Sequence, residues 1–195
     1  MLRDKLKHHK LILASGSPRR KQFFEEMELD FEIRLKAVEE VYPNDLKGKD
    51  IPEFLAQLKA SVFEGTLKAN EILITSDTIV WYKNKSLAKP KDKNEACEML
   101  AELSNDWHDV ITSVAFTTPN DQITVSHTTK VKFKALTKEE ILYYVEKFNP
   151  YDKAGAYGIQ EWLGLIGIEG IQGGYTNVVG LPTHLVYKTL TDMVE

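Results

Sequence analysis

The sequence contains a single cysteine, Cys97, among its 195 residues, so an internal disulfide is excluded and a reducing compartment is favoured. Long hydrophobic runs are also missing, and no stretch approaches the length of a membrane span. The first ten residues, MLRDKLKHHK, have no apolar core of signal-peptide length. From these absences we expect a soluble protein of the cytoplasm that does not act on membranes.

Positive charge is not in excess. Lysine and arginine number 25 against 29 aspartates and glutamates, a formal net charge of −4, and this balance disfavours nucleic acid as a partner. An anionic ligand would therefore need a local cluster of positive charge. With 43% hydrophobic and 28% charged residues, no repeats and no obvious linker, the chain is predicted to form a single domain over residues 1–195.

Several catalytic signatures are absent as well. The sequence has no G-x-x-x-x-G-K-[ST] loop, which excludes a P-loop protein. It has neither H-E-x-x-H nor G-x-S-x-G, and the five histidines show no metal-ligand spacing with Cys97. Any catalytic site must be built from other residues.

The first half of the chain alternates strand and helix patterns. Apolar runs at 10–14 and 72–77 predict short buried strands, and the alternation at 31–35 predicts a half-exposed one. Between them, apolar residues at helical spacing predict a helix over 51–69. The run ILITSD ends at Asp77, so we expect this acid at the C-terminal end of a strand.

The second half combines hairpins and capped helices. Two strong β-runs, DVITSVAFTT and ITVSHTTKVKF, flank a turn at 119–121 and predict an antiparallel hairpin. We also predict a hairpin about 83–85, helices opened by capping boxes at Asp92 and Thr137, a glycine-rich β segment over 163–180, and a last helix from Pro182. The fold class predicted from this order is α/β, with a mixed sheet and helices packed against it.

The stretch SGSPRR at 15–20 follows the first predicted strand and has the character of a helix start. Ser17 stands at a good N-cap position before a proline. A helix N-terminus favours anions, while the hydroxyls of Ser15 and Ser17 and the guanidinium groups of Arg19 and Arg20 suit phosphate. The alternative is a capped helix with two solvated arginines, and the hexapeptide alone does not decide between them.

Acids and lysines supply further candidates. Asp77 could hold a divalent cation or act as a general base, or it could merely cap a turn. Glu39 and Glu40, after a predicted strand, suit Mg²⁺ or are plain surface charge. Lys59 and Lys89 are either point charges for phosphate or ordinary surface lysines. The set gains weight only if its members converge on one metal–polyphosphate site.

Taken together, these motifs resemble the Maf, or septum formation inhibitor, family of nucleoside triphosphate pyrophosphatases. The resemblance runs from LILASGSPRRK to VVGLPTHLVYKTL, through EE at 39–40, SDTIV at 76–80, LAKP at 87–90, HDVITSVAF at 108–116 and DKAGAYGIQ at 152–160. It implies an elongated mixed sheet in two lobes with a central cleft. It also implies hydrolysis of a nucleoside triphosphate to the monophosphate and pyrophosphate with Mg²⁺ or Mn²⁺, and a homodimer is expected only at the level of the family.

Carried over by motif, the resemblance implies that Asp77 accepts a proton from water and faces the metal together with Glu39. It implies phosphate contacts or supporting positive charge from Ser15, Ser17, Arg19, Arg20, Lys59 and Lys89.

Within the family, the motifs are similar to those of the branch acting on dTTP and UTP, and the resemblance marks Arg19, Thr78 and Gln160 for substrate choice. An amide such as that of Gln160 can both donate to and accept from a pyrimidine edge. One departure is QEWLG at 160–164, where relatives commonly have glycine soon after the glutamine. Trp162 could therefore reshape the base pocket or stack on the base.

Two other functions stay open at this point. One is a pyrophosphatase for 7-methyl-GTP or another modified nucleotide, which a substrate panel would separate. The other is a nucleotide-binding regulator of cell division in which hydrolysis is incidental. Asp77 and the complete set of basic positions argue against a dead site, but a sequence does not give a rate.

Overall fold

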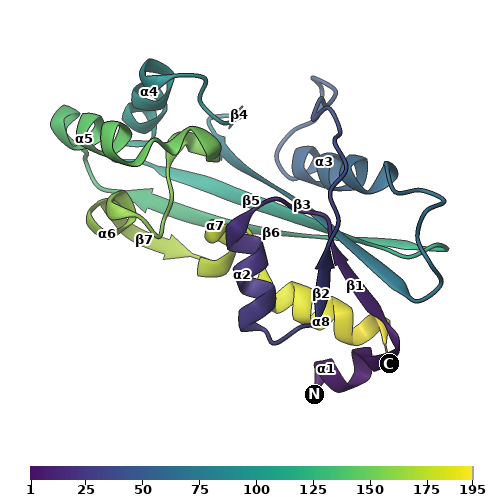
Figure 1. Ribbon diagram of the computed structural model, residues 1–195. Helices are drawn as coiled ribbons and strands as arrows, with labels where there is room; N and C mark the ends of the chain where they lie inside the picture. Colours follow the sequence, from purple (N-terminus) through teal and green to yellow (C-terminus); the bar gives the residue numbers. More distant parts are fainter. Residues whose placement is uncertain (195) are drawn as a thin grey trace. The chain divides into compact units, whose positions relative to one another are not determined.

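The computed structural model describes residues 1–194, and within them the chain forms one mixed seven-stranded sheet with helices packed on it (Figure 1). The strand order is β2-β1-β3-β5-β6-β7, with β4 paired to β3 outside this path. Strand β1 runs parallel to both β2 and β3, whereas the pairs β3–β4 and β6–β7 are antiparallel. The predicted fold class, a mixed sheet flanked by helices, is confirmed.

The elements have the following bounds. The strands are β1 Lys10–Leu13, β2 Phe31–Ile33, β3 Glu71–Tyr82, β4 Lys85–Leu87, β5 Trp107–Thr117, β6 Gln122–Phe133 and β7 Ile168–Gln172. The α-helices are α1 Leu2–Lys5, α2 Pro18–Glu26, α3 Asp50–Ser61, α4 Lys93–Leu103, α5 Lys138–Phe148, α6 Trp162–Gly167, α7 Tyr175–Val179 and α8 Thr183–Met193. Short 3-10 turns are η1 Leu6–His8, η2 Pro150–Asp152 and η3 Ala154–Ala156. Across residues 1–194, no helix is long and apolar enough to cross a membrane.

Two compact units are built from this chain. Within the described residues, unit 1 comprises residues 1–77, 112–127 and 180–194, and unit 2 comprises residues 78–111 and 128–179. Strands β3, β5 and β6 contribute residues to both units. The single domain over 1–195 and the central cleft stay predictions.

In unit 1, helices cover both faces of β1 and β3. Alternate strand residues such as Leu11, Leu13 and Ile74 pack with α1, α2 and α8 in one apolar cluster. Residues of the opposite parity, Ile12 and Leu73, pack with the end of α3 in a second cluster. This division follows from the strand geometry, because successive side chains point to opposite faces of a sheet.

In unit 2, α4 and α5 lie side by side, and η3 packs against α4 (Figure 1). The buried faces of the two helices are apolar, with Leu100 and Leu103 on α4 and Ile141, Tyr144 and Val145 on α5. These positions recur at the helical period that the sequence displays.

Most local predictions from turn and cap chemistry are confirmed. Ser17 caps α2 with proline at the first helical position, and Thr137 and Glu140 form a complete capping box on α5. Lys83 and Asn84 both adopt positive φ in the β3–β4 turn, as a tight hairpin requires. Asp92 caps α4, although the Glu95 carboxylate accepts from the Lys91 amide rather than completing the predicted box.

Four predicted boundaries are wrong. The segment 163–180 contains α6, β7 and α7 rather than one β segment, because its apolar residues form short helical turns on either side of a five-residue strand. The helix predicted over 51–69 ends at Ser61, followed by turns, and the strand predicted over 31–35 ends at Ile33. Strand β3 continues to Tyr82, so Asp77 lies inside a strand and not at its end.

Candidate active site

The SGSPRR stretch forms a hydrogen-bonded turn between β1 and α2. The Ser15 hydroxyl oxygen accepts from the Ser17 amide at 3.2 Å, and the Ser17 hydroxyl oxygen accepts from the Arg20 amide at 3.4 Å. Gly16 is exposed, and a side chain there would meet no atom within 4 Å. Neither packing nor a positive φ requires glycine at this position, so its smallness leaves the backbone of the turn open to a ligand.

Arg20 joins this turn to two distant segments of unit 1. Its Nε donates to the Gly180 carbonyl at 3.0 Å, and its Nη1 donates to the Ser76 carbonyl at 2.9 Å and to Ser15 Oγ at 3.4 Å. Burial lowers the pKa of Arg20, and the nearby charge of Asp77 partly offsets that effect. Arg20 therefore fixes the turn against the β3 residue that precedes Asp77. Its neighbour Arg19 is half-buried on the first turn of α2.

Lys59 brings two carboxylates together. Its Nζ lies 2.5 Å from Asp77 Oδ1 and 3.1 Å from Glu40 Oε2. The side chains of Lys59 and Asp77 are only 16% and 12% exposed, so their attraction is screened less than that of a surface pair. Helix α3 supplies the lysine and β3 supplies the aspartate.

Asp77 lies inside β3 and not at its end as predicted, but the neighbouring strand β1 ends before it. The parallel ladder between β1 and β3 ends at the pair Leu13↔Ile74, and the Ala14 amide donates to the Ile74 carbonyl. After Ala14 the first strand turns away into SGSPRR, while β3 continues. Asp77 lies three residues past the last Cα partner of β1, and one carboxylate oxygen is held by Lys59.

Of the two adjacent glutamates, the structure brings Glu40 to the site. Glu40 contacts Lys59, whereas Glu39 is exposed and its carbonyl accepts from the Val41 amide in a local turn. Both lie in the segment 34–49, which has no helix or strand of its own. The role assigned to Glu39 stays a prediction.

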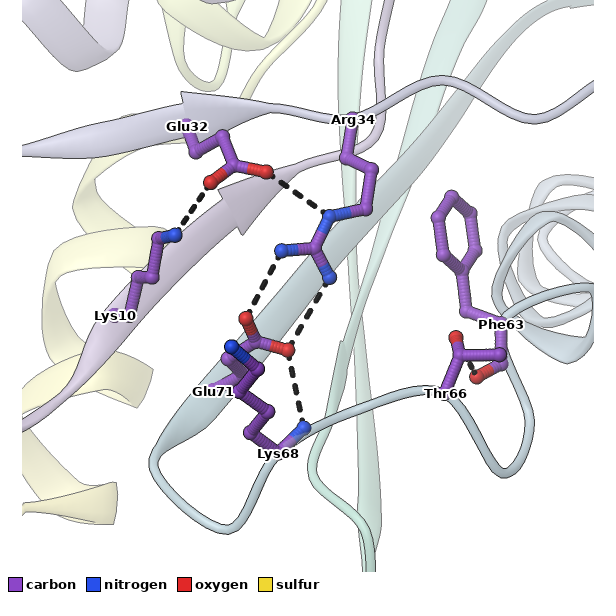
Figure 2. A network of polar contacts seen from close by, with 7 residues as sticks. All are labelled: Lys10, Glu32, Arg34, Phe63, Thr66, Lys68 and Glu71. Carbon is purple, nitrogen blue, oxygen red and sulfur yellow. Dashed lines mark hydrogen bonds and ion pairs between the residues drawn. The ribbon is translucent and has the colours of Figure 1, made fainter.

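A polar network anchors the beginning of that segment, as Figure 2 shows. Arg34 donates from Nη1 and Nη2 to the two carboxylate oxygens of Glu71, at 3.2 and 2.9 Å, and from Nε to Glu32 at 3.0 Å. Glu71 is 1% exposed and also accepts from the Lys68 amide. The Arg34 hydrogen bonds lower the pKa of Glu71 to about 2, so the carboxylate stays charged. Sequence analysis missed this pair, because nothing local links two residues 37 positions apart.

The remaining predicted residues belong to unit 2. Thr78 is half-buried on β3, Lys89 is exposed after β4, and Gln160 is exposed after the DKAGAYGIQ motif. The Gly155 amide donates to the Ala88 carbonyl at 3.3 Å, which places this motif beside the LAKP segment. Two motifs therefore meet in space through residues 67 positions apart, Ala88 and Gly155.

Gly155 is a position where the backbone and the packing both require glycine. Its φ is +67°, and a Cβ would lie 2.8 Å from Val80 Cγ2. We expect Gly155→Ala to destabilise the protein by about 2–3 kcal/mol, combining backbone strain with overpacking. The matched control is Gly65→Ala, where φ is +68° and no atom lies within 4 Å. Denaturant unfolding of the two variants isolates the packing term, and equal losses would contradict this explanation.

Contacts within the protein account for the packing of Trp162, without a bound nucleotide. Its ring contacts Tyr143 of α5 in an edge-on arrangement, with the ring centroids 4.8 Å apart. The residue beside it, Glu161, accepts a hydrogen bond from Tyr144 and pairs with Lys153. Glu161 is a second residue that the sequence did not single out, because its partners Tyr144 and Lys153 lie elsewhere in the chain.

The donor set of unit 1 fits a divalent cation shared with a ligand rather than a dedicated metal centre. Among residues 1–194, no group of three or more histidine, cysteine, aspartate or glutamate side chains could hold a metal ion. Two carboxylates, those of Asp77 and Glu40, do converge on the Lys59 ammonium. Mg²⁺ commonly binds one or two carboxylates together with substrate phosphates and water.

Fold and geometry together define a mixed α/β protein with an open serine–glycine turn next to an acid–lysine cluster. The sequence profile of the family described as "Maf-like protein" matches residues 10–193, and the chain belongs to the Maf family. The resemblance inferred from the sequence is thereby confirmed.

Relatives and one solved structure extend this result. The chain is 60% identical over 195 residues to the "dTTP/UTP pyrophosphatase" of Flavobacterium johnsoniae, covering 100% of both chains. It is 44% identical over 189 residues to the protein of the same name from Bacteroides fragilis, covering 96% of this chain and 98% of that one. "The structure of the Staphylococcus aureus Ham1 protein" aligns with 16% identity and a TM-score of 0.55, covering 94% of this chain and 99% of that one, and it supports the fold alone.

Proposed function

We propose that this protein is a nucleoside triphosphate pyrophosphatase that hydrolyses dTTP and UTP to the monophosphate and pyrophosphate. The observation that carries the proposal is the largely buried Lys59–Asp77 pair beside a serine–glycine turn that Arg20 ties to the same strand. Full-length relatives named dTTP/UTP pyrophosphatase support the substrate class.

In the proposed reaction, Asp77 accepts a proton from a water molecule whose oxygen attacks the α-phosphorus. The bond from that phosphorus to the oxygen bridging the β-phosphate breaks, and pyrophosphate leaves with its electron pair. Asp77 is suited to this role because it is mostly buried yet has a second carboxylate oxygen besides the one that contacts Lys59.

The basic and hydroxyl groups are proposed to position the triphosphate and offset its charge. Ser15 and Ser17 lie in the open turn, Arg19 lies beside it, and Lys59 supplies charge next to Asp77. Phosphoryl-type transfer depends mainly on such positioning and electrostatic stabilisation. Lys89 of unit 2 is assigned the same task, while Arg20 contributes mainly by fixing the turn through its bonds to Gly180 and Ser76.

Mg²⁺ or Mn²⁺ is the proposed cofactor. Asp77 and Glu39 are the ligands that the family motif implies, and Glu40 is the acid that contacts Lys59 in this structure. When bound, the ion neutralises negative charge on the phosphate oxygens and the leaving group.

Recognition of the base is proposed to involve Arg19, Thr78 and Gln160. Gln160 offers both a donor and an acceptor to a pyrimidine edge, and its side chain is exposed. The remaining parts of the proposal are a location in the cytoplasm, no nucleic-acid or membrane partner, and a homodimer.

The proposed function is tested by pyrophosphate release from dTTP, UTP, CTP, GTP, 5-methyl-UTP and 7-methyl-GTP, with Mg²⁺, with Mn²⁺ and with chelator. We expect metal-dependent release led by dTTP and UTP, and loss of release when the ion is chelated. Release led by 7-methyl-GTP would keep the chemistry but reject the substrate assignment. Nucleotide binding without any release would favour the division-regulator hypothesis.

A further inference from the structure

The loop that carries Gln160 is held rigidly by side chains for which the proposed reaction has no use. Gln160 itself is exposed, but Tyr157 and Ile159 before it are buried, at 6% and 7% exposure. An amide that reads a base must keep its donor and acceptor in place before the ligand arrives, since ordering a loop on binding costs affinity. What fixes this loop therefore bears on base selection.

Glu161, the residue directly after Gln160, connects this loop to Tyr144 of α5 and to Lys153. Its carboxylate accepts a hydrogen bond from the Tyr144 hydroxyl at one oxygen and pairs with Lys153 Nζ at the other, at 3.1 Å. The Tyr144 hydroxyl oxygen in turn accepts from the Gly158 amide at 3.0 Å. Both ends of the turn that leads into Gln160 are therefore tied to one tyrosine of α5.

The side chains that make these contacts are largely buried, which restricts their movement. Tyr144 is fully buried and stacks on Phe148, and burial raises the pKa of its hydroxyl, which therefore remains a proton donor. Lys153 and Glu161 have side chains only 11% and 25% exposed. A Cβ on Gly158 would lie 2.9 Å from the Glu161 carboxyl carbon, so the backbone of the turn packs directly against this carboxylate.

Two further contacts hold the same loop from other sides. His108 Nε2 lies 2.8 Å from the Tyr157 hydroxyl, and burial lowers the pKa of His108 to about 4, so the ring is neutral at pH 7. Gly164 approaches the Ile159 carbonyl so closely that any side chain at this position would overlap it. The backbone on both sides of Gln160 is thus constrained.

We propose that Glu161, held by Tyr144 and Lys153, is a positioning residue that fixes Gln160 for pyrimidine recognition and so determines base discrimination. We call the Glu161 carboxylate together with its partners Tyr144 and Lys153 the Glu161 lock. This inference rests on the proposed function, because it assigns Gln160 to the base.

The test uses the full-length protein and the variants Glu161→Gln and Tyr144→Phe. The glutamine is isosteric and keeps an acceptor for Tyr144 but loses the ion pair to Lys153, whereas the phenylalanine removes both hydroxyl contacts. Matched controls on the same helix are Glu146→Gln, which breaks an exposed pair with Lys93, and Tyr143→Phe, which removes an exposed hydroxyl next to Tyr144.

The first readout is the ratio of kcat/KM for dTTP or UTP to that for CTP. We expect each lock variant to lower this ratio about tenfold, the effect of one mispositioned hydrogen-bonding group. The loss should appear mainly as a higher KM for dTTP and UTP. Inhibition by inorganic tripolyphosphate, which has no base, should change less than about twofold in the same variants, an amount smaller than one weak hydrogen bond. A general loss of structure would instead weaken both the turnover of dTTP and UTP and the inhibition by tripolyphosphate.

The second readout, hydrogen exchange of the Gly158 amide, needs no substrate. Its exchange should accelerate in Tyr144→Phe and stay unchanged in Tyr143→Phe. The inference is overturned if the exchange rates match the wild type, or if they rise while base discrimination is retained. Failure of the wild-type protein to release pyrophosphate from dTTP and UTP would instead reject the proposed function, and the exchange result would still report whether the lock exists.

Discussion

Asp77→Asn is expected to lower kcat/KM for dTTP and UTP by about 10²–10⁴-fold, the contribution of a general base. Asparagine keeps the shape of the side chain and an oxygen that can accept from Lys59, but it cannot take a proton from water. Since Lys59 retains its contact with Glu40, at 3.1 Å, the fold should survive the substitution. Nucleotide binding, measured by calorimetry with a non-hydrolysable triphosphate, should remain near the wild-type level.

Asp50→Asn is the matched control for this prediction. It makes the same chemical change in unit 1, at the start of α3, where the acid is 56% exposed. Turnover of this variant should equal that of the wild type. Near-normal turnover of Asp77→Asn would contradict the role of Asp77 as base. Loss of binding together with loss of metal dependence would identify Asp77 as a metal ligand instead.

Glu71→Gln is expected to reduce the free energy of unfolding at pH 7 by about 3 kcal/mol, a loss typical of breaking a buried ion pair. The reason is geometric: Glu71 is 1% exposed, and both its oxygens accept from Arg34, so the variant leaves the guanidinium with Glu32 as its remaining charged partner. Denaturant unfolding provides the measurement. Glu102→Gln, which breaks an exposed pair with Lys85, should cost less than about 1 kcal/mol.

The same substitution has a defined pH dependence. Arg34 lowers the pKa of Glu71 from its usual 4.5 to about 2 in the folded protein. A group whose pKa falls on folding stabilises the fold above its unfolded pKa, so this contribution is complete above about pH 4.5 and is lost as the pH falls toward 2. The stability difference between wild type and Glu71→Gln should shrink over that window, and a difference that stays constant would reject the assignment.

Local chemistry allowed several features to be predicted from the sequence. The cap at Ser17, the capping box at Thr137 and the positive-φ turn at 83–84 act within four residues, so their patterns indicate structure directly. The same holds for β5 and β6, hydrogen-bonded neighbours in the sheet whose strands are strongly β-forming and separated by a short turn. The mixed sheet followed from these elements.

Local patterns gave wrong predictions where an element differs in type or in length from what its composition suggested. The glycine-rich stretch 163–180 has β-forming residues, yet it folds as two short helices around β7. Strand β3 runs past Asp77 because TIVWY continues the β-forming pattern up to the turn at Lys83. Neither predicted boundary is marked by a capping residue or a proline, so local capping chemistry did not locate it.

By itself, the sequence determined the residues available for the site and the family to which the chain belongs. The tertiary structure decided which of them meet: Lys59 with Asp77 across 18 positions, Arg20 with Ser76 across 56, and Glu40 rather than its neighbour Glu39 with Lys59. It also revealed the Arg34–Glu71 pair and the Glu161 lock. The physical reason is range, since capping and periodicity act over one or two turns, whereas contacts between elements depend on which faces the whole chain buries together.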